Sequence, residues 1–244
     1  MKTGIQVSSL KPLLKTGKQV RLACKKMAAL GCRYVQLQWI DEQVSVEEIA
    51  ASLKENGLIS VSVQDFYQTV CENLKYYVNL NKVTGGTWLT VSRIPERCKS
   101  REGLDIFVEE LRDLDEKLKP LGQRINFHPV TADYNAVPGM DAVSYILDAM
   151  EELTLCLDLF HLNRNCGDMP AFIRRYAGRI PMVHFKDEEE NGKLVPAGQG
   201  RVNYSGVVEA CRKAGVEYGF VEQETWEGDP YDCLGQALEW LAGE

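Results

Sequence analysis

The chain has 244 residues, is 45% hydrophobic and carries a formal net charge of −7. These values suit one large folded core and argue against nucleic acid as a partner bound through bulk electrostatics. No stretch approaches the roughly 18 consecutive apolar residues of a membrane span, and residues 1–20 hold no apolar segment of secretory length. The eight cysteines form no CxxC pair, so we expect reduced core residues in a cytoplasmic protein rather than a disulfide framework.

Short β-rich runs alternate with helical patterns in the first half of the chain. The expected strands are residues 5–10, 34–37, 58–63 and 87–91. Helices are expected around 20–28, 46–56 and 69–81, and glycines end the first two of them. A longer helix has one apolar face, which consists of Leu104, Phe107, Val108, Leu111, Leu114 and Leu118.

The same alternation continues to the end of the chain. The expected strands are residues 124–128, 153–158, 180–185 and 217–222, and helices are expected around 141–150, 169–176, 204–214 and 234–241. Eight βα units without a linker predict a single α/β domain over residues 1–244, a closed (β/α)8 TIM barrel. A doubly wound open sheet is the alternative, but no GxGxxG follows the first strand, so a dinucleotide-binding fold has no support.

Polar residues that titrate or bind metals gather at the ends of the later strands. His128, His161 and His184, the only histidines, fall at or just after the ends of strands five, six and seven. Asp158 and Glu222 close strands six and eight. Taken singly, Asp158 could cap a helix, His184 could be a core histidine and Glu222 could be a solvated loop residue. Together they favour a shared site, because the active site of such a barrel lies at the C-terminal ends of its strands.

Carboxylate and imidazole groups from neighbouring strands indicate a metal site of mixed oxygen and nitrogen donors. Such a site suits a divalent ion that tolerates water and substrate oxygens, with Mn²⁺ as the first choice and Mg²⁺ or Co²⁺ as alternatives. We expect no cysteine at a matching position, which argues against thiolate-selected zinc.

Four segments carry a resemblance to a known family. CLDLFH (156–161), VHFKD (183–187), AGQGRVNY (197–204) and FVEQE (220–224) resemble the sugar phosphate isomerase/epimerase family of xylose isomerase-like barrels. Its relatives include ketose 3-epimerases, hydroxypyruvate isomerases, inosose dehydratases and, more distantly, endonuclease IV. The resemblance implies that Asp158, His184 and Glu222 are metal ligands and that Glu222 is also an acid/base group.

Strand five departs from the family pattern. The family usually has a metal-binding Glu or a Y-H-N-H-x-x-E-F segment there, whereas this chain has FHPVTADY (127–134). His128 keeps the first histidine position and Asp133 stands where the glutamate would be. We expect His128, or else Asp133, to supply the missing catalytic group, and His128 to complete the metal shell. Gln36 in strand two also stands where many relatives have Glu.

The family chemistry implies an isomerase or epimerase acting on a ketose-like sugar through an enediolate intermediate. A divalent ion would stabilise the charge that develops when Glu222 removes the α-proton. The same site would allow a lyase or dehydratase acting on a keto-sugar or inosose. The missing glutamate favours a third reading, a non-catalytic sugar-binding or accessory subunit. An endonuclease IV-like role needs a site richer in histidine than three residues allow.

Further side chains are expected to bind the sugar. His161, Lys186, Arg201 and Trp226 are the candidates, with Phe66 and Tyr67 as an added apolar wall. The alternatives are loop capping for His161, surface ion pairs for Lys186 and Arg201, and ordinary packing for the aromatic residues. Residues 187–190 are predicted to be a solvated acidic loop tip. The sequence leaves open which sugar is bound, whether it is phosphorylated, and whether the chain forms a homo-oligomer.

Overall fold

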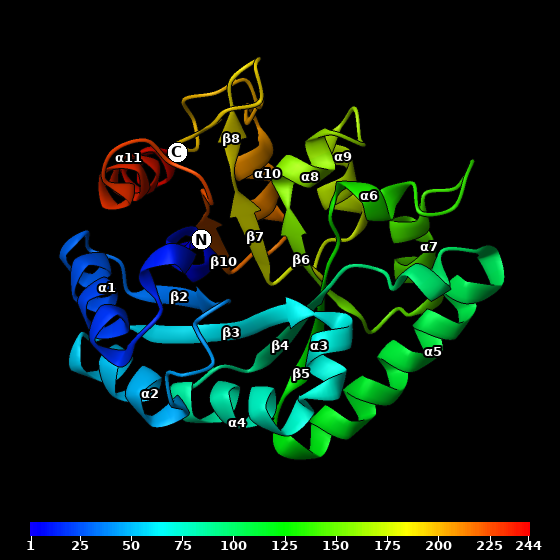
Figure 1. Ribbon diagram of the computed structural model, residues 1–244. Helices are drawn as coiled ribbons and strands as arrows, with labels where there is room; N and C mark the ends of the chain where they lie inside the picture. Colours follow the sequence, from blue (N-terminus) through cyan, green and yellow to red (C-terminus); the bar gives the residue numbers. More distant parts are fainter.

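The computed structural model describes residues 1–244, and its centre is a closed barrel of eight parallel strands (Figure 1). The pairing order is β1-β10-β7-β6-β5-β4-β3-β2, so the strands follow one another around the barrel in chain order. The barrel strands are β1 (Lys2–Gln6), β2 (Tyr34–Leu37), β3 (Ile59–Phe66), β4 (Trp88–Ser92), β5 (Arg124–His128), β6 (Thr154–Asp158), β7 (Met182–Phe185) and β10 (Tyr218–Val221). The predicted (β/α)8 barrel is confirmed.

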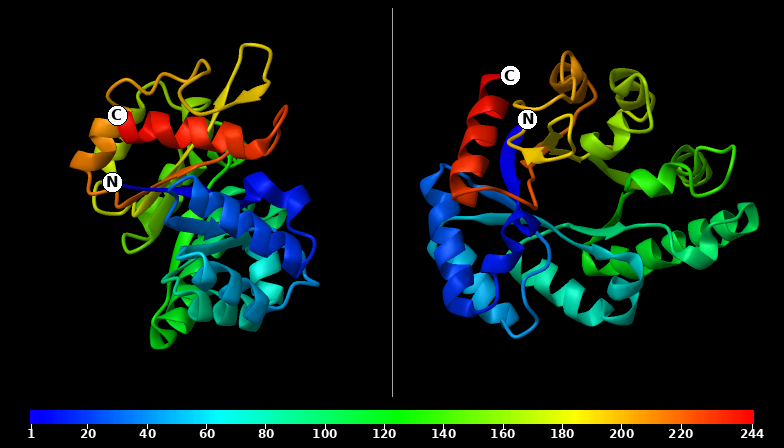
Figure 2. Two further views of the ribbon diagram at one scale, coloured as in Figure 1. Left: turned by 90° about the vertical axis from the view of Figure 1, so that its left-hand side faces the viewer. Right: turned by 45° about the horizontal axis from the view of Figure 1, so that its top comes forward.

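Helices surround the barrel (Figure 2), and α11 packs against β1, so the two ends of the chain meet. The helices are α1 (Gly17–Ala29), α2 (Val46–Glu55), α3 (Tyr67–Glu72), α4 (Leu74–Thr84), α5 (Arg101–Leu118), α6 (Thr131–Tyr134), α7 (Ala142–Ala149), α8 (Leu159–Asn163), α9 (Met169–Arg175), α10 (Val207–Lys213) and α11 (Pro230–Gly243). Three short 3-10 helices are η1 (Val7–Leu13), η2 (Glu96–Cys98) and η3 (Lys119–Leu121). No helix has both the length and the apolar character needed to cross a membrane.

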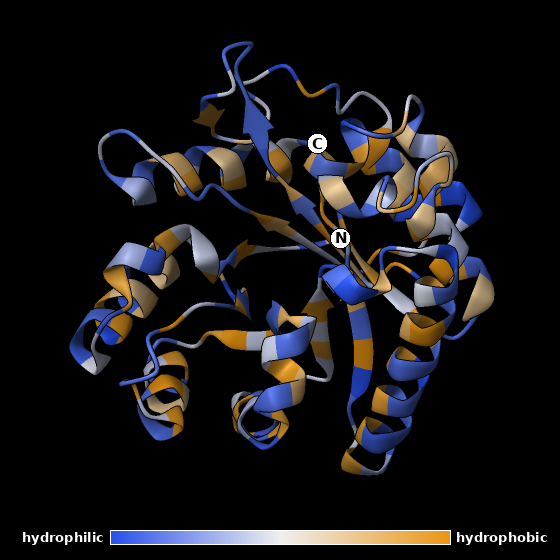
Figure 3. Cartoon of the chain, turned by 45° about the vertical axis from the view of Figure 1, so that its right-hand side comes forward, coloured by the Kyte–Doolittle hydropathy of each residue, from blue (hydrophilic) through white to orange (hydrophobic).

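The main core lies between the barrel and its helices. Figure 3 shows hydrophobic and hydrophilic residues alternating along the outer helices, which bury only one face. The predicted apolar face of α5 is buried, including Leu104 and Phe107. Inside the barrel, a small apolar cluster of Val61, Cys156, Met182 and Phe220 lies below a polar layer. This polar layer is where the functional side chains are found.

The first strand differs from its prediction of residues 5–10. Strand β1 ends at Gln6, and the following residues form the 3-10 helix η1. The Gln6 side chain caps this helix by accepting a hydrogen bond from the Ser8 backbone N–H. The buried, partly apolar run therefore turns across the barrel mouth instead of continuing as a strand, which brings Ser8 toward Glu222. The helix expected at 69–81 likewise divides into α3 and α4 at Asn73.

The acidic segment 187–190 is only partly the solvated tip that was predicted. Asp187 and Glu188 are buried in β8 (Asp187–Glu188), which pairs with β9 (Leu194–Val195), whereas Glu190 is exposed. The Asp187 carboxylate accepts backbone N–H bonds from Gly198 at 3.1 Å and Gly200 at 2.9 Å. A Cβ at position 200 would lie 2.3 Å from an Asp187 oxygen, so this close approach requires glycine. The glycine-rich segment thus encloses an internal carboxylate.

Candidate active site

Strand register brings the predicted metal ligands together. Asp158 ends β6 and lies opposite His184 of β7, and His184 lies opposite Phe220 of β10, two residues before Glu222. Ligand atoms of Asp158, His184 and Glu222 all lie within 4.8 Å of one another, and all three residues are buried. His128 ends the neighbouring strand β5. The C-terminal end of the barrel therefore holds the four residues together.

The spacing of these atoms fits a single ion. His184 Nδ1 lies 3.0 Å from Glu222 Oε2 and 4.0 Å from Asp158 Oδ2. His128 Nε2 lies 3.2 Å from His184 Nδ1 and 3.9 Å from Asp158 Oδ2. Ligands about 2.1 Å from a shared octahedral ion lie about 3 Å apart when adjacent and about 4.2 Å apart when opposite. The observed distances fall between these limits.

Two carboxylate oxygens in this cluster accept no well-aligned hydrogen bond. Asp158 Oδ2 and Glu222 Oε2 are buried, and the Lys186 ammonium lies 3.6 and 3.4 Å from them. Their sister oxygens are engaged, because Asp158 Oδ1 accepts the backbone N–H bonds of residues 160 and 161, and Glu222 Oε1 accepts from the Ser8 hydroxyl at 2.8 Å. Asp158 is therefore both the helix cap and a member of the site. Two buried negative charges that share one ammonium group leave room for a further cation.

The orientation of His184 is set from behind by Gln36. Gln36 Oε1 lies 2.5 Å from His184 Nε2, and because an amide oxygen can only accept, Nε2 carries the proton. Nδ1 then faces Asp158 and Glu222, and it can bind a metal ion once it loses the proton that the raised pKa of His184 keeps there. Gln6 donates to the same Gln36 oxygen at 3.1 Å. Gln36, which replaces the glutamate of many relatives in strand two, thus orients His184.

A cysteine does reach this cluster, contrary to the sequence expectation. Cys156 Sγ lies 3.2 Å from His184 Nε2, and Cys156, His128 and His184 form a second set of close donor atoms. Side chains two apart on a strand share a face, so Cys156 lies one layer below Asp158 inside the barrel. It contacts the nitrogen of His184 that faces away from the carboxylates, so the oxygen-rich set remains the better fit to a hard divalent ion.

Local charges set the protonation states of the cluster. Cys156 and Glu222 outweigh burial and raise the pKa of His184 well above its usual range, so a metal ion would displace a proton from that residue. Burial would raise the pKa of Asp158, but the neighbouring His161 and Lys186 outweigh it and hold that pKa at about 2. Burial is likewise outweighed at Glu222, where Lys186 and His184 hold the pKa well below its usual range. Burial and the neighbouring His184 lower the pKa of His128 to about 3. At neutral pH the carboxylates are therefore ionised and His128 is neutral.

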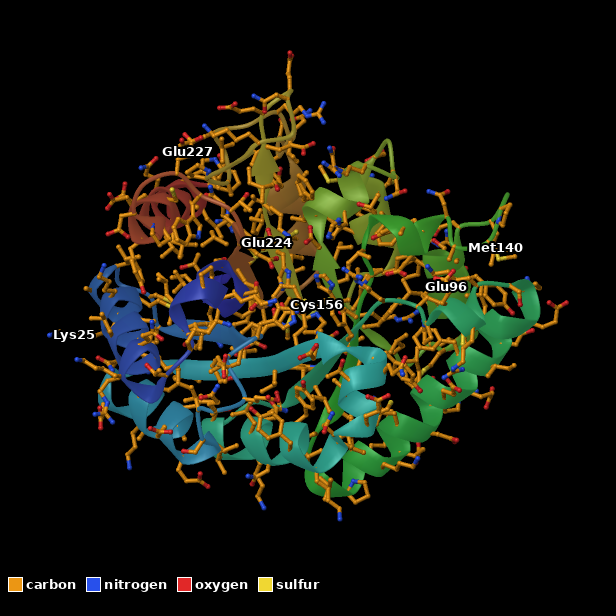
Figure 4. The ribbon with its side chains drawn as sticks, viewed as in Figure 1. Lys25, Glu96, Met140, Cys156, Glu224 and Glu227 are labelled. Carbon is orange, nitrogen blue, oxygen red and sulfur yellow. The ribbon has the colours of Figure 1, made fainter.

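Lys186 is buried beside the cluster rather than in a surface ion pair. Its Nζ lies 3.4 Å from Glu222 Oε2, 3.6 Å from Asp158 Oδ2 and 2.6 Å from Glu224 Oε1. These three carboxylates outweigh burial and raise the pKa of Lys186. Burial, reinforced by the nearby Glu222, raises the pKa of Glu224. Figure 4 shows Glu224 near the middle of the molecule, whereas Glu227 lies farther out.

A pocket of about 460 Å³ opens above the cluster. Five of the predicted site residues line it, namely His128, Asp133, His161, Lys186 and Glu222. Phe66 and Trp39 add an aromatic wall, with ring centroids 5.9 Å apart. His161 Nδ1 lies 2.8 Å from the Thr131 hydroxyl, and its Nε2 lies 3.6 Å from Asp158 Oδ2. His161 therefore lies where it could contact a substrate oxygen, as predicted.

Three predicted substrate contacts lie elsewhere. Arg201 pairs with Glu188 at 2.6 Å beside the β8–β9 hairpin. The Trp226 indole N–H donates to the Ser9 carbonyl at 2.9 Å, and Tyr67 packs edge-on against Phe107. None of the three lines the pocket. Their partners lie in the β8–β9 hairpin, in η1 and in α5, which strand periodicity alone does not reveal.

Asp133 lies at the pocket wall, but its oxygens are already engaged. They accept backbone N–H bonds from Ile94 at 3.0 Å and Val130 at 2.8 Å. The carboxylate thus links the loop after β4 to the loop after β5. This arrangement favours a positioning role over the acid/base role that was the second choice for strand five.

Sequence reasoning missed several residues that face the pocket. Those in the first half follow or end strands β2, β3 and β4, as Gln38, Gln64 and Arg93 do. In the second half, Arg164 and Glu224 were missed. The rule that strand ends carry the site would have found most of them, but amides and lone arginines are too common in loops to stand out.

Comparison with known proteins agrees with the fold. A family model described as a xylose isomerase-like TIM barrel matches residues 24–243. The chain is similar to the structure of a sugar phosphate isomerase/epimerase from Parabacteroides distasonis ATCC 8503, with 14% identity, a TM-score of 0.81, and coverage of 98% of this chain and 92% of that chain. It is also similar to an L-ribulose 3-epimerase, with 15% identity, a TM-score of 0.75, and coverage of 99% and 94%.

A third similar structure is a probable 3-DHS dehydratase involved in petrobactin synthesis from Bacillus anthracis. It shares 13% identity and a TM-score of 0.74, with 99% of each chain covered. At these identities the likeness establishes the fold. A comparison with curated proteins finds no significant match.

Proposed function

The chain belongs to the xylose isomerase-like TIM barrel family, and we propose that it is a divalent-metal-dependent isomerase or epimerase of a ketose-like sugar. The predicted family and the predicted enzyme class are confirmed at that level, since both the family and its structural neighbours include sugar isomerases and epimerases. The metal, the substrate and the residue roles are the substance of the proposal.

One observation carries the proposal. Two buried carboxylate oxygens, Asp158 Oδ2 and Glu222 Oε2, converge on Nδ1 of His184, at 4.0 and 3.0 Å. His128, at the end of strand β5, stands within reach of the same point. We therefore assign Asp158, His184, Glu222 and His128 as the metal ligands. Mn²⁺ is the first candidate for a mixed donor set of this kind, with Mg²⁺ or Co²⁺ next.

A bound divalent ion would supply positive charge for the carbonyl and hydroxyl oxygens of an α-hydroxy ketone. Glu222 is the base that removes the α-proton, because it is ionised, borders the pocket and is held in place by Ser8. The Lys186 ammonium lies 3.4 Å from Glu222 Oε2, so it also favours negative charge that develops on the substrate.

The second proton-transfer group is better supplied by Glu224 than by His128. His128 is buried and its pKa is lowered to about 3, so it does not carry a proton at neutral pH. Glu224 lines the pocket and its pKa is raised by burial and by Glu222. A carboxyl group with a raised pKa is suited to donating a proton, as a general acid does. Return of the proton to the opposite face gives epimerisation, and return to the adjacent carbon gives isomerisation.

The same site would also serve a lyase, because loss of a β-hydroxyl from the same intermediate gives dehydration. The similarity to a probable dehydratase supports this second candidate. A sugar-binding subunit without turnover is the third. Such a subunit would bind the metal ion through Glu222 but would not use this carboxylate as a base.

The test is metal analysis of the purified protein followed by a ketose panel in deuterated water. Incorporation of deuterium at the α-carbon together with an epimer or isomer is the expected result. Elimination of water would identify a lyase instead. Bound metal without exchange on any sugar would favour the binding subunit, and absence of metal from protein grown and purified with Mn²⁺ would refute the metal site.

A further inference from the structure

We propose that the substrate carries an anionic group, a phosphate or a carboxylate, which Arg93 binds in the pocket wall that follows strand β4. This inference rests on the proposed function, because it names the class of sugar that the same pocket takes. It is carried by four features of the pocket wall after strand β4.

The first feature is that the Arg93 guanidinium has no carboxylate partner. Every other lysine or arginine that lines the pocket has one: Lys186 pairs with Glu224, Lys99 with Glu96 and Arg164 with Glu188. Arg93 instead lies over the ring of Phe66, with its Cζ 4.5 Å from the ring centroid. Stacking on an aromatic face leaves the in-plane N–H groups free for a planar, two-point contact with an oxyanion.

The second feature is backbone strain at the same wall. Trp39 and Arg93 are the only non-glycine residues with positive φ, at 56° and 68°. Both line the pocket. Trp39 follows β2 and Arg93 follows β4, and both contact Phe66 at the end of the intervening strand β3. A left-handed conformation is costly for a residue with a side chain, and it persists where the surroundings enforce it, often at ligand sites.

The third feature is the clamp that enforces the turn at Arg93. The next residue, Ile94, donates its backbone N–H to the buried carboxylate of Asp133 at 3.0 Å. Arg93 itself donates its backbone N–H to the His128 carbonyl at 3.4 Å. Both contacts come from the β5 side, so the loop after β4 is fixed to the strand that carries a proposed metal ligand. This gives the buried Asp133 a role in positioning Arg93.

The fourth feature is the balance of charge around the pocket. The part of the wall contributed by β2, β3 and β4 contains no carboxylate. Arg164 adds positive charge, because its partner Glu188 is shared with Arg201, so that one carboxylate serves two guanidinium groups. A neutral sugar would leave Arg93 without a partner, whereas a phosphate or carboxylate would supply one. The geometry therefore favours an acidic sugar whose carbonyl lies at the metal and whose anionic group reaches Arg93.

Calorimetric binding to the Mn²⁺-loaded protein at low ionic strength tests the inference with three ligands of similar size. D-fructose is neutral, D-fructose 6-phosphate carries a phosphate and 2-keto-D-gluconate carries a carboxylate. We expect one of the two anions to bind at least about tenfold more tightly than D-fructose, as a charge-assisted hydrogen bond allows. The anion that gains identifies which of the two groups the pocket takes.

Two variants show whether Arg93 is responsible. In Arg93→Gln the anion preference should fall by about tenfold, whereas Arg93→Lys, which keeps the charge, should retain part of it. Arg101→Gln is the matched control, because Arg101 also stacks on an aromatic ring, that of Tyr145 at 4.1 Å, but does not line the pocket. The affinity of an anion held only by the metal ion would not change with any of the three substitutions. Thermal unfolding midpoints check that each variant is folded.

Equal binding of the neutral and charged ligands would overturn the inference, as would a preference that survives in Arg93→Gln or failure of both anions to bind. These outcomes are separate from those of the proposed function, because binding is measured without turnover. Exchange of the α-proton on neutral ketoses with no anion preference would leave the isomerase intact and remove this inference. An Arg93-dependent preference for anions without α-proton exchange on any ketose would support this inference and remove the proposed isomerase activity.

Discussion

The two halves of the barrel present different chemistry to the same pocket. Strands β1 to β4 and their loops contribute amides, aromatic rings and the unpaired Arg93, whereas β5, β6, β7 and β10 contribute every histidine and carboxylate of the site. In Figure 1 the first group is coloured blue to cyan-green and the second green to orange, on opposite sides of the barrel. Under the proposed function, metal binding and proton transfer belong to the second half, and recognition of the rest of the substrate belongs to the first.

This separation has a physical basis. Carboxylates, imidazoles and an ammonium group hold one another in their required protonation states only when they are close together and buried. Lys186 does this for Asp158 and Glu222 at 3.6 and 3.4 Å. Groups that only bind a substrate need no such coupling and can vary independently. Variants in the two halves should therefore affect different measurements.

The largest effect is expected from Glu222→Gln. This change keeps an oxygen for the metal but removes the basic group, so α-proton exchange should fall by about 10²- to 10⁴-fold. Substrate affinity should change far less, because the first half of the barrel is intact. The measurements are deuterium exchange by NMR and ligand binding by calorimetry, with metal content determined for each sample. Exchange at the wild-type rate would place the base elsewhere, with Glu224 as the next candidate.

Asp158→Asn should mainly affect the metal. The change is nearly isosteric, but a neutral amide is a weaker ligand, so metal affinity should fall at least about 100-fold, beyond the usual effect of losing a supporting hydrogen bond. Asp65→Asn is the matched control, since Asp65 lies near the end of β3 but accepts from the Tyr77 hydroxyl at 2.7 Å, outside the main pocket. Metal titration under a competing chelator gives both values. Unchanged metal content in Asp158→Asn and also in His184→Ala would rule out the proposed centre.

The fold was predictable because periodicity reports it directly. Eight alternations of strand and helix patterns, with buried faces such as that of α5, leave few architectures other than a closed barrel. The errors lie where side-chain hydrogen bonds override hydrophobicity. Gln6 ends β1 early by capping η1, and Asp187 buries itself in backbone N–H groups although its neighbours suggest a solvated acidic loop.

The site was predictable in the second half and not in the first. Aspartate, histidine and glutamate at successive strand ends are rare enough to indicate a shared site, and the structure places them together. The residues of the first half are amides and a lone arginine, whose significance depends on partners that a sequence does not show. The predictions that Arg201 and Trp226 contact the substrate were wrong for the same reason. Their actual partners, Glu188 and Ser9, are determined by loop geometry.

Gln36 is the exception that links the two halves, and a smaller effect is expected there. It lies in β2 but accepts the Nε2–H of His184. Gln36→Leu removes this acceptor and lets His184 take the tautomer that cannot bind the metal through Nδ1, so metal affinity should fall about tenfold. Gln64→Leu is the control, because Gln64 is a buried pocket amide that bonds to Gln38 rather than to a ligand. Equal metal affinity in wild type and Gln36→Leu would confine metal binding to the second half.

The smallest expected effect concerns the free energy of unfolding at acid pH. Its histidine-dependent part should come from the second half of the barrel, because all three histidines lie there. His128 is buried, its Nδ1 has no hydrogen-bond partner, and burial lowers its pKa from 6.5 to about 3. As the pH falls below 6.5 the unfolded chain takes up a proton at this residue and the folded chain does not. The free energy of unfolding should therefore decrease with falling pH, by up to about 1.4 kcal/mol per pH unit for one such group.

Asp158 and Glu222 act in the same direction but at lower pH, because their pKa values are lowered from 3.8 and 4.5. Urea unfolding of the metal-free protein between pH 6.5 and 5 therefore avoids these two carboxylates, and comparison with single histidine variants isolates the contribution of each histidine. His128→Gln should give a shallower decrease than wild type, and His161→Gln should change the slope less, because His161 is more exposed than His128, 19% against 6% for the side chain. An identical slope in wild type and His128→Gln would mean that His128 has the same pKa in the folded and unfolded chains, which would contradict the lowered pKa.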